Sequence, residues 1–201
     1  MGNTVNKFIF FLIICVNLCA CITQKTDYTS FLHPEYILVE GDQISGWLKE
    51  DIIIETPYGK MKAAAIGGKS GYLFDLICYG NGNPKIIWLR DDTDIIYDSM
   101  HITLPAFRGG ARGVFFHKNF KIERCRNKNE VEYMGIFIPA NSSLHFDENG
   151  KLCRLTVEQD WMVDGVMYYI GQNFNIIDKK IVPDYKNIRS KGDIILYEED
   201  D

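Results

Sequence analysis

Short apolar or alternating runs, each closed by a turn signal, dominate the chain after residue 30. The clearest runs are residues 51–55, 72–79, 85–89, 113–116 and 134–138, and the turn clusters are residues 57–60, 80–84, 108–110 and 148–150. No stretch keeps an apolar period of 3.6 residues over three turns, as an amphipathic helix would. This spacing predicts an all-β fold: an antiparallel meander of hairpins that forms a twisted, elongated sheet or an open barrel.

The clearest single hairpin surrounds Asn149-Gly150. This dipeptide favours a two-residue turn in which both residues have positive φ. The turn sets the following residues opposite each other: Glu148 and Lys151, Phe146 and Cys153, His145 and Arg154, and Leu144 and Leu155. Because side chains alternate between the two faces of a strand, we expect Cys153 in the core and His145 on the surface.

A faint internal repeat covers residues 46–65, 135–157 and 165–183. Each unit would be one hairpin, which cannot bury its apolar face alone. The string from Phe146 to Leu152 fits the pattern F-x-x-N-G-x-L, and it resembles hairpin-repeat segments of uncharacterised bacterial exported proteins. The resemblance implies units that stand side by side in one sheet, and it implies no activity.

An apolar run occupies residues 8–18, with the sequence FIFFLIICVNL. It is shorter than the roughly 20 residues that a membrane-spanning helix needs. Lys7 precedes it and small residues follow it, which is the arrangement of a secretory signal peptide.

The next four residues, Leu18-Cys19-Ala20-Cys21, identify the kind of signal peptide. An ordinary signal peptidase needs small residues at positions −1 and −3. Cleavage after Ala20 would place the large Leu18 at −3, so this site fits an ordinary signal peptidase poorly. The four residues resemble a bacterial lipobox, which has an aliphatic residue at −3, a small one at −1 and a cysteine at +1. The resemblance implies that residues 1–20 are removed and that Cys21 is lipidated, so that acyl chains anchor the protein in a membrane.

The expected organisation is a signal peptide at 1–20, a polar tether at 21–30 and a single β-rich domain at 31–201. The expected location is the bacterial cell envelope. Ile22 rather than aspartate follows Cys21, which favours the outer membrane over the inner one. If the match to the processing pattern is fortuitous, the protein is cytoplasmic instead.

Composition and motifs narrow the possible functions. The formal net charge of −5 argues against a nucleic-acid partner. The four histidines are all more than four residues apart in the sequence, so no local metal pair is predicted, and neither a catalytic motif nor a cofactor is expected. Cys78, Cys125 and Cys153 could supply one disulfide of undetermined pairing, and at least two of them are expected to be buried hydrophobic residues.

One glycine-rich stretch, residues 106–118, collects basic side chains beside three phenylalanines. Arg108, Arg112, His117 and Lys118 are the candidate contacts for an anion such as a lipid headgroup or a glycan phosphate. The alternative is a hairpin loop whose arginines are solvated.

These patterns predict a membrane-anchored lipoprotein that acts as a non-enzymatic binding or envelope-structural module. Its partners would be membrane lipid, through acylated Cys21, and an envelope or host molecule. The alternative is a hydrolase of an envelope polymer or another secreted enzyme. Two carboxylates in one pocket, with raised pKa values, would favour the enzyme, whereas an open sheet would favour the module.

Overall fold

The computed structural model describes residues 27–67, 74–108, 112–178 and 180–184 of the 201-residue chain. The signal peptide, the lipobox with Cys21, and most of the expected tether lie outside these residues. The described chain begins with two short 3-10 helices, Tyr28–Phe31 and Pro34–Tyr36, and continues entirely in strands and connecting loops.

The larger layer is one antiparallel sheet of ten strands. In spatial order these are β1 (Leu38–Glu40), β2 (Gln43–Gly46), β5 (Leu76–Tyr79), β6 (Pro84–Ile87), β9 (Val114–Phe116), β10 (Ile122–Arg126), β13 (Ser143–Phe146), β14 (Leu152–Thr156), β17 (Asn173–Ile177) and β18 (Lys180–Pro183). The strands follow the order of the sequence, and β1 and β18 are the edge strands of the sheet among the described residues. The predicted all-β antiparallel meander is confirmed, and the sheet does not close into a barrel.

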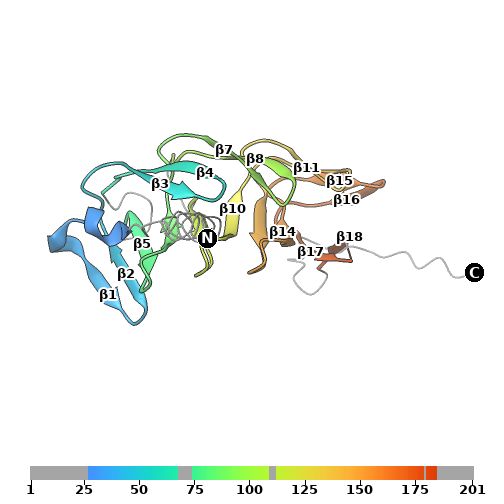
Figure 1. Ribbon diagram of the computed structural model, residues 1–201. Helices are drawn as coiled ribbons and strands as arrows, with labels where there is room; N and C mark the ends of the chain where they lie inside the picture. The colour runs from blue at the N-terminus through green and yellow to red at the C-terminus, as the bar shows by residue number, and fades with distance from the viewer. Residues whose placement is uncertain (1–26, 68–73, 109–111, 179, 185–201) are drawn as a thin grey trace, which may run out of the picture.

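The second layer consists of four two-stranded hairpins that interrupt the meander between successive pairs of sheet strands. They are β3 (Ile52–Thr56) with β4 (Gly59–Ala63), β7 (Thr93–Tyr97) with β8 (Met100–Leu104), β11 (Val131–Tyr133) with β12 (Ile136–Ile138), and β15 (Trp161–Val163) with β16 (Val166–Tyr168). All four lie along the same face of the sheet (Figure 1). None of these four hairpins therefore packs on the opposite face of the sheet.

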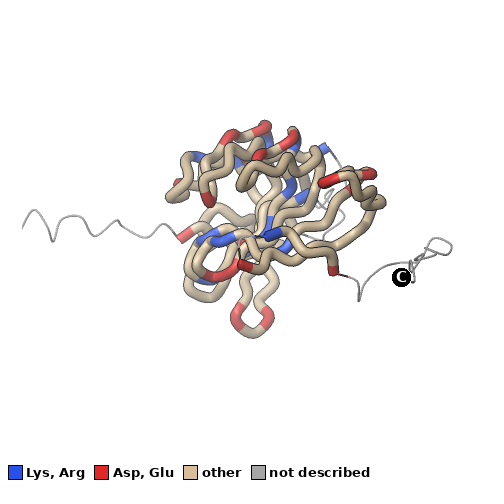
Figure 2. Tube along the Cα trace, turned by 90° about the vertical axis from the view of Figure 1, so that its right-hand side faces the viewer, with Lys and Arg blue, Asp and Glu red and all other residues tan. Residues whose placement is uncertain are grey.

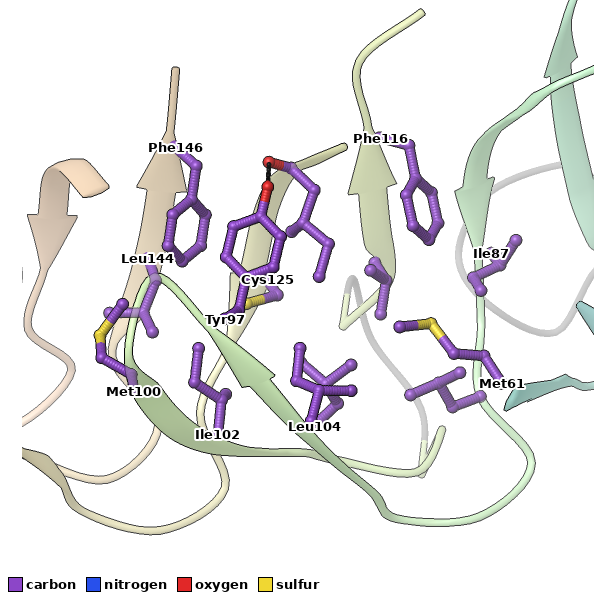
Figure 3. Packing of buried hydrophobic residues seen from close by; sticks show 14 of the residues in the cluster. Met61, Ile87, Tyr97, Met100, Ile102, Leu104, Phe116, Cys125, Leu144 and Phe146 are labelled. Carbon is purple, nitrogen blue, oxygen red and sulfur yellow. Dashed lines mark hydrogen bonds between the residues drawn. The ribbon is translucent and has the colours of Figure 1, made fainter. Parts of the chain in front are cut away.

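The main core lies between the sheet and the hairpins, because both layers alternate apolar and polar side chains. In Figure 3, Met61, Met100, Ile102 and Leu104 project from the hairpins toward the side chains of the sheet strands. From the sheet side, the fully or almost fully buried residues include Cys78, Ile87, Phe116, Cys125, Leu144, Leu155 and Phe174. Burial of these apolar side chains from both layers is what fixes each hairpin over its pair of strands.

Tyr97 makes a polar contact across this core. Its side chain comes from β7, is 3% exposed, and donates a hydrogen bond to the carbonyl oxygen of Ile122 in β10 at 3.2 Å (Figure 3). Burial raises the pKa of the Tyr97 phenol well above its usual range. The hydroxyl therefore stays protonated and keeps its partner while the ring packs among apolar side chains.

The backbone contacts recur at a fixed interval in the C-terminal half. The Asn141 N–H donates to the Asn127 carbonyl at 2.7 Å, and the Gly171 N–H donates to the Val157 carbonyl at 2.7 Å. Both intervals are 30 residues (171 − 141 and 157 − 127). The strand pairs of hairpins β11–β12 and β15–β16 are related by the same shift. One structural unit is therefore a hairpin of the second layer followed by two strands of the sheet.

The predicted turn at Asn149-Gly150 is wrong in one respect. Only Gly150 of the two has positive φ, at 82°, and its N–H donates to the Asp147 carbonyl at 2.9 Å. The turn is therefore longer than two residues, and the strands slip by one position beyond it.

The slip changes which residues face the core. The pairs Leu144–Leu155 and His145–Arg154 are confirmed, but Phe146 pairs with Leu152 rather than with Cys153. Cys153 then forms a bulge and is exposed, so its expected place in the core is wrong. Cys78 and Cys125 are buried free thiols, as expected for at least two of the three.

Candidate functional site

The structure does not gather the four predicted anion contacts into one site. Strand β9 separates them, since Arg108 and Arg112 precede it whereas His117 and Lys118 follow it. His117 follows Arg112 by five positions, which span about 16 Å of extended chain. The predicted cluster is thus two separate groups at opposite ends of a strand.

The group after β9 is occupied by structural contacts. His117 Nε2 lies 2.9 Å from the Phe146 carbonyl oxygen, and Lys118 Nζ lies 2.6 Å from Asp42 Oδ2. The lysine lowers the pKa of the Asp42 carboxyl through this hydrogen bond and its charge. His117 and Lys118 therefore fasten the β9–β10 turn to the neighbouring strand β13 and to the turn after β1.

The group before β9 consists of two exposed arginines. Arg108 lies close enough to Asp92 to contribute to the lowered pKa of that carboxyl, although the Ala106 N–H and Lys128 contribute more. Arg108 thus shares its surroundings with a carboxylate that already has two partners. Arg112 forms no hydrogen bond or ion pair with the described residues, so nothing there joins it to Arg108 in one site.

A different set of basic residues lies on the face of the sheet away from the hairpins. One residue from each of the ten strands forms an unbroken row of directly paired neighbours across this face. From β1 to β18 the row reads Leu38, Ser45, Ile77, Ile86, Phe115, Arg124, His145, Arg154, Asn175 and Val182. The first half of the row is mostly apolar, and its Ile86 and Phe115 are buried in a second, small hydrophobic cluster with Trp88. Arg124, His145 and Arg154 follow as its sixth to eighth members.

The orientation of this row follows from the pattern of burial. In β13 the flanking residues Leu144 and Phe146 enter the core, so His145 between them points to the opposite face. Figure 2 shows acidic positions along the outer turns of the hairpin layer and several basic positions on the sheet strands beneath. The ten sheet strands themselves carry five basic residues, Lys85, Arg124, Arg126, Arg154 and Lys180, and two acidic ones, Glu40 and Glu123, even though the whole chain is acidic.

The hydrogen bonds of His145 define its protonation state. Arg154 Nη2 lies 3.4 Å from His145 Nδ1, and Ser143 Oγ lies 3.3 Å from His145 Nε2. Because a guanidinium donates and never accepts, Nδ1 must carry a lone pair. Its proton is then on Nε2, which donates to the serine hydroxyl, and the imidazole is neutral.

The surroundings of His145 favour the same neutral form. Desolvation, followed by the positive charges of Arg154 and Arg124, lowers the pKa of His145 from 6.5 to about 4. Both arginines act on it from adjacent strands, and no carboxylate of the described residues compensates them. The ring is therefore a neutral acceptor between two cations at neutral pH.

The two arginines are held differently. The Arg124 guanidinium carbon lies 3.8 Å from the centre of the Phe115 ring, the next residue along the row. Arg154 reaches instead toward His145. Neither arginine forms an ion pair with a carboxylate of the described residues, whereas Arg126, on the same face, binds Glu158 at 2.9 Å. Arg124 and Arg154 thus have guanidinium donors to offer a ligand.

Polar side chains continue this surface beyond the arginines. Thr156 and Asn173 are the pair next to Arg154 and Asn175, and the Thr156 hydroxyl lies 2.5 Å from Asn173 Oδ1. Cys153 lies in the bulge beside Arg154, and its thiol donates to the His145 carbonyl at 3.3 Å. The face thus combines cations, hydroxyls and amides, which suits the binding of a polar anionic ligand.

Features of an acid–base or metal site are not seen among the residues that the structure describes. Every aspartate with a perturbed pKa has it lowered by hydrogen bonds or ion pairs, as for Asp51, whose pKa falls to about 2 beside Arg90. In the described ranges, no three His, Cys, Asp or Glu side chains are arranged to hold a metal ion. Across the same residues, no helix is long and apolar enough to cross a membrane.

Comparison with known proteins adds no relative. No family model matches the sequence, and no curated protein or solved structure is significantly similar to it. The candidate site therefore rests on the geometry of the sheet.

Sequence reasoning found part of this site without assigning it a role. The pairing of His145 with Arg154 follows from the hairpin, and it correctly places both residues on the same face. Arg124 could not be added, because it joins them through the pairing of β10 with β13, across the intervening hairpin β11–β12.

Proposed function

We propose that this chain is a lipid-anchored bacterial lipoprotein that works as a non-enzymatic binding module, with the face of the sheet away from the hairpins as its binding surface. The observation that carries the proposal is the placing of Arg124 and Arg154, without carboxylate partners among the described residues, on either side of His145. The lipobox at residues 18–21 supports the anchor, and Ile22 favours the outer membrane.

The chemistry of the described acidic residues supports a module rather than a hydrolase. A glycoside hydrolase needs a carboxylic acid whose pKa is raised so that it can donate a proton. The aspartates with shifted pKa values change in the opposite direction, and ion pairs or backbone N–H groups hold them ionised. Such carboxylates serve as structural contacts in this fold.

The anchor is tested by metabolic labelling with palmitate in a bacterial host. The wild-type chain is expected to incorporate label and Cys21→Ala is not, because the lipid is attached to that thiol. Cys19→Ala is the matched control: it removes a cysteine two residues away that processing would discard, so it should label normally. Equal labelling of wild type and Cys21→Ala would refute the anchor.

The binding surface is tested by the reactivity of Cys153. Its thiol is exposed beside Arg154, whereas Cys78 and Cys125 are buried. Burial raises the pKa of these two thiols to about 12, and partial desolvation also raises the pKa of Cys153. A solubilised cell-envelope fraction should slow the reaction of Cys153 with a maleimide in the membrane-bound protein.

The control for this footprint carries Lys60→Cys together with Cys153→Ser, since Lys60 is exposed on the hairpin layer. Its labelling rate should stay the same when the envelope fraction is added. An unchanged rate at Cys153, or equal slowing at both positions, would refute the choice of the sheet face as the binding surface.

A further inference from the structure

We infer that Arg124 and Arg154 bind one phosphate group of a phosphodiester ligand between them, and that His145 takes up a proton when this anion binds. The inference rests on the proposed function, because it uses the same face of the sheet. It adds the chemical class of the ligand and a dependence of its affinity on pH.

The spacing of the strands permits both arginines to reach one phosphate. Arg124, His145 and Arg154 are direct neighbours on β10, β13 and β14. Adjacent strands lie about 4.8 Å apart, so the two arginine backbones are about 10 Å apart with the imidazole between them. Two arginine side chains can close over that distance, and a guanidinium presents two parallel donors to a phosphate.

The Arg124 side chain is restrained by an aromatic neighbour on β9. The stacking of the Arg124 guanidinium on Phe115, at 3.8 Å, restricts the side chain while its N–H groups remain free of carboxylates. The hydroxyl of Ser143 lies on the same face, and because it accepts from His145 Nε2 it keeps its own proton to donate to the anion.

Proton uptake follows from what surrounds the imidazole. His145 faces Arg124 on β10, Arg154 and the Cys153 thiol on β14, and Ser143 on its own strand. A phosphate that draws Arg154 away leaves Nδ1 without its donor. Its negative charge also offsets the two cations that disfavour the imidazolium. The bound anion therefore raises the proton affinity of His145, and by linkage protonation raises the affinity for the anion.

The size of the expected change in affinity follows from the pKa of His145 before the anion binds. Its pKa of about 4 lies below the ordinary value of 6.5. If the anion restores the ordinary value, proton linkage strengthens binding about tenfold at pH 5.5 and hardly at all at pH 7.5. A phosphodiester keeps a single charge throughout this range, so the change in affinity would report on the protein.

The test uses the processed, lipidated protein in nanodiscs of phosphatidylcholine, with glycerophosphoglycerol as the probe in calorimetric titrations. We expect wild type to bind about tenfold more tightly at pH 5.5 than at pH 7.5. Arg124→Gln and Arg154→Gln should each weaken binding at least tenfold, because each removes charged hydrogen bonds to the phosphate. His145→Gln should lose the pH dependence, so that its affinities at pH 5.5 and pH 7.5 should be equal.

The matched control is Lys60→Gln, which removes one positive charge from the outer face of the hairpin layer and should bind as wild type does. Near-ultraviolet circular dichroism checks that each variant is folded, and Arg154→Lys, which keeps the charge, should retain part of the affinity. Binding by both arginine variants equal to wild type, or a pH dependence that survives in His145→Gln, would overturn the inference.

A second arm separates two sources of the phosphodiester. Discs that contain about three parts in ten of phosphatidylglycerol are compared with discs of pure phosphatidylcholine. Weaker binding of the probe in the mixed discs would assign the site to a lipid headgroup, and unchanged binding would assign it to a soluble or polymeric phosphodiester.

The outcomes also distinguish this inference from the proposed function. A protein that labels with palmitate and is footprinted at Cys153, but binds no glycerophosphoglycerol at about 10 mM, would overturn the phosphate site and leave the anchored module standing. Binding of the probe by a chain that incorporates no palmitate would overturn the lipid anchor and leave the phosphate site standing.

Discussion

Asp98 connects the hairpin layer to the sheet, and replacing it tests how the two layers are held together. It lies in the turn of hairpin β7–β8 with φ of 47°, and its side chain is 5% exposed. Its carboxylate accepts a hydrogen bond from the Leu152 N–H in β14 at 2.9 Å and from Lys151 Nζ at 2.7 Å. The Tyr133 hydroxyl of hairpin β11–β12 donates to the same carboxylate at 3.4 Å. One side chain thus joins two hairpins and a sheet strand.

The cost of Asp98→Ala can be estimated from these contacts. The charged hydrogen bond to the Leu152 amide contributes about 1.5–3 kcal/mol to the free energy of unfolding. Placing alanine at positive φ costs about 1 kcal/mol more. We therefore expect a loss of about 2.5–4 kcal/mol for alanine. Asp98→Asn tolerates the backbone conformation and keeps a neutral acceptor, so it should lose about 1–2 kcal/mol.

The assay is equilibrium unfolding in urea, followed by tryptophan fluorescence for wild type, Asp98→Asn and Asp98→Ala. A second readout is the titration of Tyr133, whose pKa is raised to about 12 by burial and by the charge and hydrogen bond of Asp98. Asp98→Asn should lower this pKa while leaving the effect of burial. A loss below about 1 kcal/mol for alanine, equal losses for both variants, or an unchanged Tyr133 titration would refute the reasoning.

Two further predictions concern a turn and an ion pair. Gly150→Ala should lower the free energy of unfolding by about 1–3 kcal/mol, because φ is 82° and the new methyl group would lie 2.8 Å from the Tyr97 hydroxyl. Gly135→Asn has φ of 80° but open space around it, so it should change stability by less than about 1 kcal/mol in the same urea experiment. The pKa of Asp51 is lowered to about 2, chiefly by its hydrogen bond to Arg90, so its contribution to stability is present above pH 4 and is lost as the pH falls through 2. Melting temperatures measured between those pH values should fall less steeply in Asp51→Asn, and parallel curves would contradict this.

The sequence predicts the architecture well, because alternation and turn residues act locally. The hairpin from β13 to β14 illustrates the limit of such reasoning. Asn149-Gly150 locates the turn, but its length depends on the conformation of Asn149, which keeps negative φ while Asp147 accepts hydrogen bonds from the Asn149 and Lys151 amides. That one-residue difference moves Cys153 from the expected core to the surface.

The candidate site shows a second limit, which is separation along the chain. Arg124 and His145 are 21 residues apart (145 − 124), and a complete hairpin of the other layer lies between their strands. Local patterns predicted a cluster from Arg108 to Lys118 instead, because closeness in sequence was the only measure of closeness available. An extended strand separates such neighbours, whereas pairing between strands joins distant residues.

The recurrence of backbone contacts every 30 residues has a consequence for how the protein can change in size. A copy of residues 128–157, inserted after residue 157, would enter at a point where one hairpin and two sheet strands have just been completed. The sheet would widen by two strands, or about 10 Å, and every existing pair except those at the junction would keep its partner. The face of the sheet away from the hairpins would gain a second copy of His145 and of Arg154. Its width is therefore a property that gene duplication can adjust in fixed steps, and a longer polymeric ligand could be matched by adding units.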